Sequence, residues 1–135
     1  MSKKITDIEG IGPAFAEKLA KANIRSVEKL LENGSTKSGR KNIAVASGVD
    51  EGKVLDWVNM ADLFRVKGIA SQFAELLKAA GVDTIKELRN RNADNLHAKL
   101  VEVNAEKKLT RVVPSKVMVE KFIEQAKQLD PKVTY

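Results

Sequence analysis

The sequence predicts an all-α protein made of two similar units in tandem. One observation is an internal repeat, because the segment Ile8–Leu19 returns 58 residues further on as Val66–Leu77, with glycine, isoleucine, phenylalanine and leucine at matching positions. A second is apolar spacing of three and four residues through most of the chain, and a third is that no segment has a convincing strand pattern. A repeat of this length is typical of one supersecondary unit used twice. We expect the units to cover residues 1–60 and 61–135 and to pack together.

The first unit should open with a turn and a helix from about Pro13 to Ala22. Proline suits the first helical position, because its ring fixes φ and the N–H that it lacks would be unpaired there anyway. Asn23 can end this helix in the left-handed conformation. Ser26 is the expected N-cap of a short second helix at Val27–Leu31.

Two more helices complete the first unit. The polar stretch Glu32–Gly39 is rich in turn-forming residues, so we expect a loop there and a third helix at Arg40–Ala46. A second turn, Ser47–Asp50, then leads into a long periodic helix from Glu51 to Phe64, for which Asp50 is the expected N-cap.

The second unit repeats this order. Gly81 should end its first helix, Thr84 should cap a short helix at Ile85–Arg89, and a third helix is expected at Asp94–Val103. The last helix should run from about Ser115 to Leu129.

The long helices of the two units align with a different offset from the turns. Phe122 matches Trp57 at a separation of 65 rather than 58 residues, so the second unit holds seven residues more than the first. We place this insertion in the polar stretch Asn104–Arg111, as a loop or a hairpin arm. Each long helix should pack against its own first helix, Trp57 on the stripe of Phe15 and Phe122 on the stripe of Phe73.

Composition bounds the class of protein. The chain has 24 lysines and arginines against 18 acids, a formal charge of +6, which favours polyanionic partners. It contains no cysteine, which excludes disulfides and thiolate chemistry and suits a reducing compartment. The first residues lack the apolar run of a signal peptide, and no stretch approaches the roughly 20 apolar residues needed to cross a bilayer. We expect a soluble cytoplasmic protein without a membrane partner.

The repeated turn carries the clearest functional signal. In the first copy, Gly10 and Gly12 allow a tight bend with no Cβ in the way, so backbone N–H groups at the start of the next helix can approach a phosphate oxygen. The positive end of the helix dipole assists this contact. The candidate nucleic-acid contacts of the two turns are Gly10, Ile11, Gly12, Pro13, Ala14, Lys18, Lys67, Gly68, Ile69, Ala70, Ser71 and Gln72.

An apolar residue, Gly-Ile-Gly-Pro and then Ala-x-x-Leu follow one another over Ile8–Leu19, and this order resembles the helix-hairpin-helix family. Members of that family bind DNA without reading its sequence and occur in many repair and recombination proteins. The resemblance implies two tandem helix-hairpin-helix units of SAM-like fold, in which Ile11 and Ile69 hold the hairpins in the core. It also implies that a monovalent cation can sit on hairpin carbonyls and bridge to phosphate, and no other cofactor is expected.

Over nearly its whole length the chain also resembles an uncharacterised bacterial family described as helix-hairpin-helix-like. The segments that carry this resemblance are Ala61–Ile69, Ala80–Leu88 and Asn95–Asn104. The resemblance supports the fold more than any activity.

The two turns differ in ways that affect phosphate binding. Ala70 and Ser71 replace the second glycine and the proline, so a phosphate would meet an added methyl group at the second turn. Lys67 supplies a positive charge there, where the first copy has an acid. The acids that surround the first turn are Asp7, Glu9 and Glu17.

The densest basic stretch lies in and just after the expected insertion and contains Lys107, Lys108, Arg111 and Lys116, with only Glu106 against them. It can meet phosphates of a nucleic acid or be a solvated connection.

No set of residues points to catalysis or to a metal. His97 is the only histidine and has no cysteine or carboxylate at ligand spacing, so we expect an ordinary helix residue. Trp57 lies in an apolar helical pattern and should be a core anchor rather than a base-stacking platform. No nucleophile motif, phosphate-binding loop or carboxylate pair stands out. We therefore expect no enzyme, no catalytic residue and no metal site.

The sequence leaves two functions open. The first is sequence-independent DNA binding, in which the turns and nearby lysines and arginines contact the phosphate backbone. The second is a protein-interaction or scaffold module that does not bind nucleic acid and presents an apolar groove to another chain or to a second copy. The acids around the first turn and the altered second turn favour this alternative.

Overall fold

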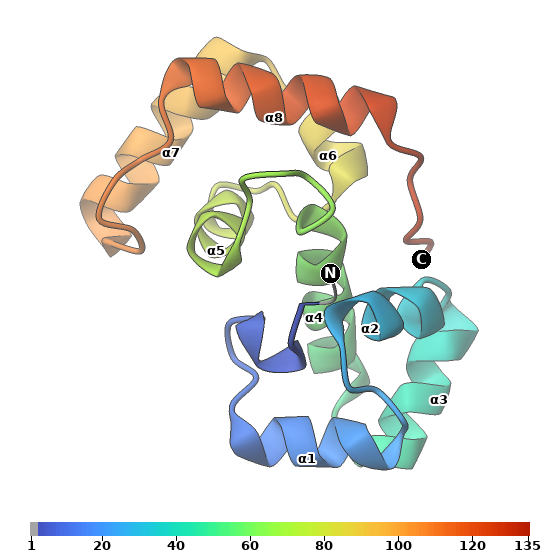
Figure 1. Cartoon of the computed structure of the whole chain (residues 1–135). Coiled ribbons are helices and arrows are strands. Elements are labelled where there is room, and N and C mark those ends of the chain that lie inside the picture. Colours follow the sequence, from blue (N-terminus) through green and yellow to red (C-terminus); the bar gives the residue numbers. More distant parts are fainter. Residues whose placement is uncertain (1–2) are drawn as a thin grey trace. The chain divides into compact units, whose positions relative to one another are not determined.

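The computed structural model describes residues 3–135, and in that range the protein is all-helical, as the sequence predicts. A single isolated bridge between Lys4 and Ser26 is the extent of its β-pairing there. The elements, shown in Figure 1, are η1 (Ile5–Asp7), α1 (Pro13–Lys21), α2 (Val27–Gly34), α3 (Lys37–Ser47), α4 (Glu51–Leu63), α5 (Ser71–Ala79), α6 (Ile85–Arg89), α7 (Ala93–Lys107) and α8 (Lys116–Gln128).

The residues form two compact units. The first contains residues up to Asp62 together with Lys132–Tyr135, and the second contains Leu63–Pro131. Arg40 explains why the tail belongs to the first unit. This buried side chain donates from Nη1 to the carbonyl of Gly34 (2.9 Å) and from Nη2 to the carbonyl of Thr134 (2.6 Å).

Helices α2 and α3 of the first unit are longer than the sequence analysis expected. The polar stretch after residue 31 was expected as a loop, but α2 continues to Gly34 and α3 begins at Lys37. The reason is a cap, because Oγ1 of Thr36 accepts the backbone N–H of Gly39 (3.0 Å) and lets the helix start three residues before Arg40. The expected caps Ser26 and Asp50 are both present; their side chains accept N–H groups of Lys29 (3.1 Å) and of Gly52 (3.0 Å) and Lys53 (3.3 Å).

In the second unit, α6 lies where the sequence places it, and α7 extends beyond its expected end. The stretch from Asn104 was expected as a loop or hairpin arm, but it is helical up to Lys107. Lys108 then ends the helix with a left-handed φ of 53°. The Asn104 side chain holds the following connection, because its Nδ2 donates to the carbonyl of Thr110 (3.0 Å) and its Oδ1 accepts the N–H of Thr110 (2.9 Å).

The apolar positions that repeat in the sequence are buried in both units. Each is at most 1% exposed, and they are Leu19, Ile24 and Leu30 in the first unit and Leu77, Val82 and Leu88 in the second. The left-handed residues also match, since Asn23 has a φ of 63° and Gly81 a φ of 92°.

The long helix of each unit packs an aromatic residue against the phenylalanine of the first helix, as predicted. In the first unit the rings of Phe15 and Trp57 are 5.1 Å apart and T-shaped, at 64°. In the second unit the rings of Phe73 and Phe122 are 6.3 Å apart and tilted, at 55°. Both arrangements lie in the range that favours aromatic pairs.

The same aromatic residues cover the first glycine of each turn. Gly10 and Gly68 have φ values of 95° and 94°, which only glycine adopts without strain. A Cβ atom on Gly10 would lie 3.4 Å from Nε1 of Trp57, and one on Gly68 would lie 3.0 Å from Cε1 of Phe122. The turn and the aromatic residue above it therefore fix each other.

The structure predicts that Gly10→Ala destabilises the protein and that Gly12→Ala has a small effect. Gly10→Ala should lower the free energy of unfolding by about 1–3 kcal/mol, because alanine is strained at this positive φ. Gly12→Ala should cost less than about 1 kcal/mol, because the φ of Gly12 is −92° and an added Cβ meets nothing within 4 Å. Urea denaturation followed by circular dichroism measures both. Equal losses of unfolding free energy for the two variants would contradict the conclusion that the fold requires glycine only at position 10.

Candidate nucleic-acid interface

The first glycine turn, residues 8–12, is closed by one short backbone contact. The N–H of Ile11 donates to the carbonyl of Ile8 (3.1 Å), and the side chains of both residues are buried. Gly10 and Gly12, on either side of Ile11, are exposed. The turn thus places its isoleucine in the core and its glycines at the surface.

Helix α1 begins directly after this turn with unpaired backbone donors. The first hydrogen bond of this helix runs from the N–H of Ala16 to the carbonyl of Gly12, the N-cap residue (2.9 Å). Within residues 3–135, no acceptor pairs with the N–H groups of Gly12, Ala14 or Phe15, and Pro13 has no N–H to offer. These three donors lie at the positive end of the helix, where an anion is stabilised.

Gly12 leaves the surface above these donors open. An added Cβ atom would meet nothing within 4 Å, and the backbone angles of Gly12, −92° and −171°, are ones that other residues adopt. Ala70 takes nearly the same conformation in the second turn, with angles of −116° and −171°. The fold therefore does not require glycine at position 12, whereas it does require glycine at position 10.

Two lysines lie beside the start of α1. The ammonium of Lys18 is 5.6 Å from the centre of the Phe15 ring, and that of Lys53, from α4, is 5.7 Å from it. Both distances are in the range of cation–π contacts. Phe15 thus brings together one basic residue that the sequence analysis named and one that it did not.

Acidic residues also surround the first turn, as the sequence shows. Asp7, Glu9 and Glu17 are all exposed. The carboxylate of Asp7 accepts the backbone N–H of Lys4 (3.1 Å), and the backbone of Lys3 bonds to Glu28 and Val27 at the start of α2. The positive charge of Lys18 and Lys53 beside Phe15 is therefore accompanied by acids around the turn.

The second glycine turn, residues 66–70, has the same backbone closure. The N–H of Ile69 donates to the carbonyl of Val66 (3.2 Å), and Ile69 is buried. The turn differs in that Gln125 of α8 binds both polar groups of the Lys67 backbone: its Oε1 accepts the N–H (3.0 Å) and its Nε2 donates to the carbonyl (3.2 Å).

The remaining predicted contacts of the second turn lie at the surface around the start of α5. Gly68, Ala70 and Gln72 are exposed, as is Lys67, and Ser71 is half-buried. Ala70 is the N-cap of α5 and makes no side-chain cap bond, and its methyl group covers the position that Gly12 leaves open in the first turn. The second turn offers a lysine but a less accessible backbone.

The basic residues Lys107, Lys108 and Arg111 are exposed and lie apart from the second turn. They occupy the end of α7 and the connection that leads to the start of α8, which can be followed in Figure 1. The turn contacts α8 at Gln125, ten residues after the Ser115 cap, which corresponds to about 15 Å along the helix axis.

The fourth residue of this basic stretch, Lys116, forms an ion pair. Lys116 at the start of α8 forms an exposed salt bridge with Asp94 (2.6 Å), and this hydrogen bond raises the pKa of Lys116 above its usual value. Lys116 is thus already paired with an acid of its own unit.

Trp57 and His97 both lie on helices, Trp57 on α4 and His97 on α7. Trp57 is 5% exposed and packs in the core of the first unit. His97 lies on α7, half-buried, and no group of three or more histidine or acidic side chains in the described residues could hold a metal. No helix in residues 3–135 has the length and apolar character to span a membrane.

Sequence reasoning missed Lys53 and Gln125. Each lies about one helical turn from the aromatic residue of its long helix, Lys53 four residues before Trp57 and Gln125 three residues after Phe122. Because residues three or four apart share a helix face, both side chains reach the turn region that the aromatic covers. The spacing to the aromatic was a signal that could have found them.

The chain belongs to the family described as Domain of unknown function (DUF4332), which matches residues 9–129. No curated protein and no solved structure matches the chain.

We predict that Gln125→Ala loosens the second turn. Loss of the side-chain acceptor should speed amide hydrogen exchange at Lys67, while exchange at Ile69, bonded to a backbone carbonyl, should change little. Exchange measured by NMR at single residues tests this. Gln128→Ala, at the exposed end of the same helix, is the matched control. An unchanged rate at Lys67 would show that Gln125 does not hold the turn.

Proposed function

We propose that the first unit is a helix-hairpin-helix module that binds the phosphate backbone of DNA without reading its sequence. The observation that carries the proposal is Gly12: the fold tolerates alanine at this position, yet the residue is a glycine above three unpaired N–H groups. A Cβ-free surface over helix donors is what a phosphate needs for close approach. Membership in a family of unknown function neither supports nor opposes phosphate binding at this turn.

The proposed contact is chemically simple. A phosphate oxygen accepts hydrogen bonds from the N–H groups of Gly12, Ala14 and Phe15 at the positive end of α1. The ammonium groups of Lys18 and Lys53 neutralise neighbouring phosphates. Because all these partners contact phosphate, the binding carries no base preference.

The second unit contributes less in this proposal. Its Lys67 supplies charge, but the backbone of that residue is bonded to Gln125 and Ala70 adds a methyl group at the contact. The second turn therefore serves mainly to hold α5 against α8.

A second candidate function is association with another protein chain. It is favoured by apolar side chains at the surface of the second unit, Val112, Val117 and Met118, which are 71%, 58% and 37% exposed. Val117 and Met118 are adjacent at the start of α8 and Val112 lies in the connection before it; a contiguous apolar surface there would mark an interaction site.

The proposed DNA contact predicts unequal effects of the same substitution in the two turns. Gly12→Val should weaken binding of a short fluorescent DNA about tenfold or more, because it covers donors whose bonds to a charged group contribute about 1.5–3 kcal/mol each. Ala70→Val adds a similar side chain in the same backbone conformation and should leave affinity within about twofold. Fluorescence anisotropy at about 50 mM salt measures both, because low salt favours phosphate contacts.

The salt dependence of the same titration tests the lysines. Two neutralised phosphates predict a slope of log affinity against log salt of about −1.8 on duplex DNA. Lys53→Gln should reduce this slope by about 0.9, while Lys29→Gln, which removes an exposed charge on α2, should not. Absence of any binding by the unmodified protein, or equal effects of the two lysine variants, would refute the proposal.

If the exposed apolar residues instead mediate self-association, sedimentation should show it. The unmodified chain would then form dimers or larger species as its concentration rises, and the double variant Val117→Ser, Met118→Ser would stay monomeric. A monomer at every concentration would remove self-association as a function of this surface.

A further inference from the structure

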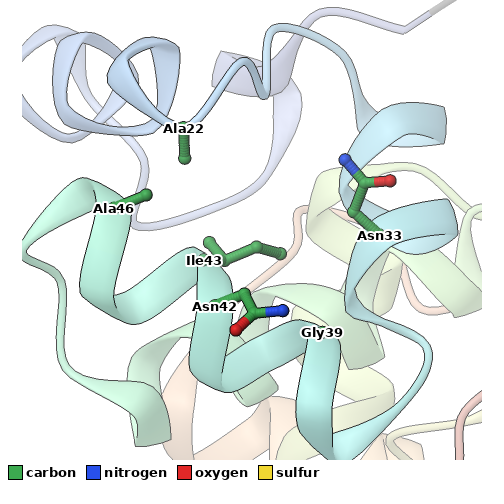
Figure 2. Close-up of a pocket in the computed structure, with 6 residues that line it drawn as sticks. All are labelled: Ala22, Asn33, Gly39, Asn42, Ile43 and Ala46. Atoms are coloured by element: carbon green, nitrogen blue, oxygen red, sulfur yellow. The ribbon is translucent and has the colours of Figure 1, made fainter.

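The first unit holds a pocket at the end of α1 that is separate from the turn. Its volume is about 340 Å³, within the range of small-ligand sites, and it lies between α1, α2 and α3. Figure 2 shows the residues that line it: Ala22, Asn33, Gly39, Asn42, Ile43 and Ala46. None of them carries a charge, so the pocket suits an uncharged group.

Two asparagines line this pocket; Asn33 is half-buried and Asn42 is exposed. Within residues 3–135, no hydrogen bond involves the side chain of Asn33 on α2 or of Asn42 on α3. Figure 2 shows Asn33 on α2 and Asn42 and Ile43 on α3, with the two amide groups pointing in different directions. Each amide offers two N–H donors and a carbonyl acceptor, so the lining of the pocket combines hydrogen-bonding groups with the apolar side chain of Ile43.

Asn42 and Gly39, two residues of α3, help to form the pocket but do not make α3 more stable. Asn42 lies in the middle of α3, where asparagine is less favourable than alanine and where it makes no compensating bond. Gly39 allows α3 to pass close to the end of α2, because a Cβ there would lie 1.9 Å from the carbonyl oxygen of Asn33. This close approach of α2 and α3 brings Asn33 and Asn42 into the lining of the same pocket.

A nucleobase matches this chemistry. Carboxamides form paired hydrogen bonds with base edges, and Ile43, Ala22 and Ala46 supply apolar surface for the face of a planar ring. Lys21 and Lys41, next to Ala22 and Asn42 in the sequence, are exposed, and neither forms an ion pair within residues 3–135. They can take the phosphates on either side of a bound base.

The position of the pocket relates it to the first turn. Helix α1 separates the two, and its nine residues correspond to about 14 Å. That length equals about four phosphates at the spacing of one duplex strand, and fewer in an extended single strand. A strand that contacts both the turn and the pocket has to span at least this length.

We propose that this pocket binds one unstacked base of a single-stranded nucleic acid. The inference rests on the proposed backbone contact at the first turn and adds the preferred form of its ligand. In a duplex the base edges are paired, so filling the pocket would require a base to leave the stack. Asn33 and Asn42 bind the base edges, and the turn binds the backbone of the same strand.

A titration with free nucleotides tests the pocket apart from the turn. Adenosine 5′-monophosphate and thymidine 5′-monophosphate are added to ¹⁵N-labelled protein, with ribose 5-phosphate as the control that lacks a base. We expect saturable shifts of the side-chain amide signals of Asn33 and Asn42 with at least one nucleotide and none with the control. No shifts, or equal shifts with the control, would overturn the inference.

A second experiment uses a single-stranded oligonucleotide and an abasic strand of the same length. The unmodified protein should bind the strand with bases about tenfold more tightly. The double variant Asn33→Ala, Asn42→Ala should lose this preference and keep its affinity for the abasic strand, whereas Asn95→Ala on α7 should behave as unmodified. An equal affinity of the unmodified protein for both strands would contradict the pocket. Binding of neither strand would refute the backbone contact, and the nucleotide titration then still decides the pocket.

Discussion

The structure depends on the contact between an aromatic residue of each long helix and the first glycine of each turn. Gly10 and Gly68 have φ values near 95°, and Trp57 and Phe122 cover them closely. The same rings contact the phenylalanine one turn into the following helix. Three elements of each unit thus meet at one point. Because the turn cannot move without losing this packing, the start of the next helix and its backbone donors are held in place.

Two turns with one backbone have different surface chemistry. The first turn keeps its position above the helix donors open with Gly12, and Lys18 and Lys53 lie beside it. In the second, Gln125 bonds the backbone of the turn, and an alanine covers the corresponding position. Both turns are held by the same kind of core contact, an aromatic residue of the long helix packed on the first glycine. We therefore propose a binding role for the first turn and a structural role for the second.

Much of the fold could be predicted from the sequence, because local signals determine it. The repeat, the helical periodicity and caps such as Ser26 set the order of the helices. The errors arose in two polar stretches: the Thr36 cap lets α3 begin early, and α7 continues to Lys107 through a stretch that was expected to be a loop. Turn-forming composition alone does not distinguish a capped helix from a loop.

The candidate site could be predicted only in part. The glycines of the first turn follow from the motif, but Lys53 and Gln125 reach the turns through packing of the long helices, which the motif does not contain. The pocket between Asn33 and Asn42 requires the close passage of two helices that the sequence analysis had separated by a loop. Tertiary contacts of this kind carry no signal in local composition.

The most direct test of the central claim is an NMR titration of backbone amides with a short oligonucleotide at low salt. If the turn presents its donors to phosphate, the largest shifts should occur at Gly12, Ala14 and Phe15, with smaller ones at the second turn. Shifts confined to other surfaces, or none at these three amides when the oligonucleotide is bound, would contradict the account.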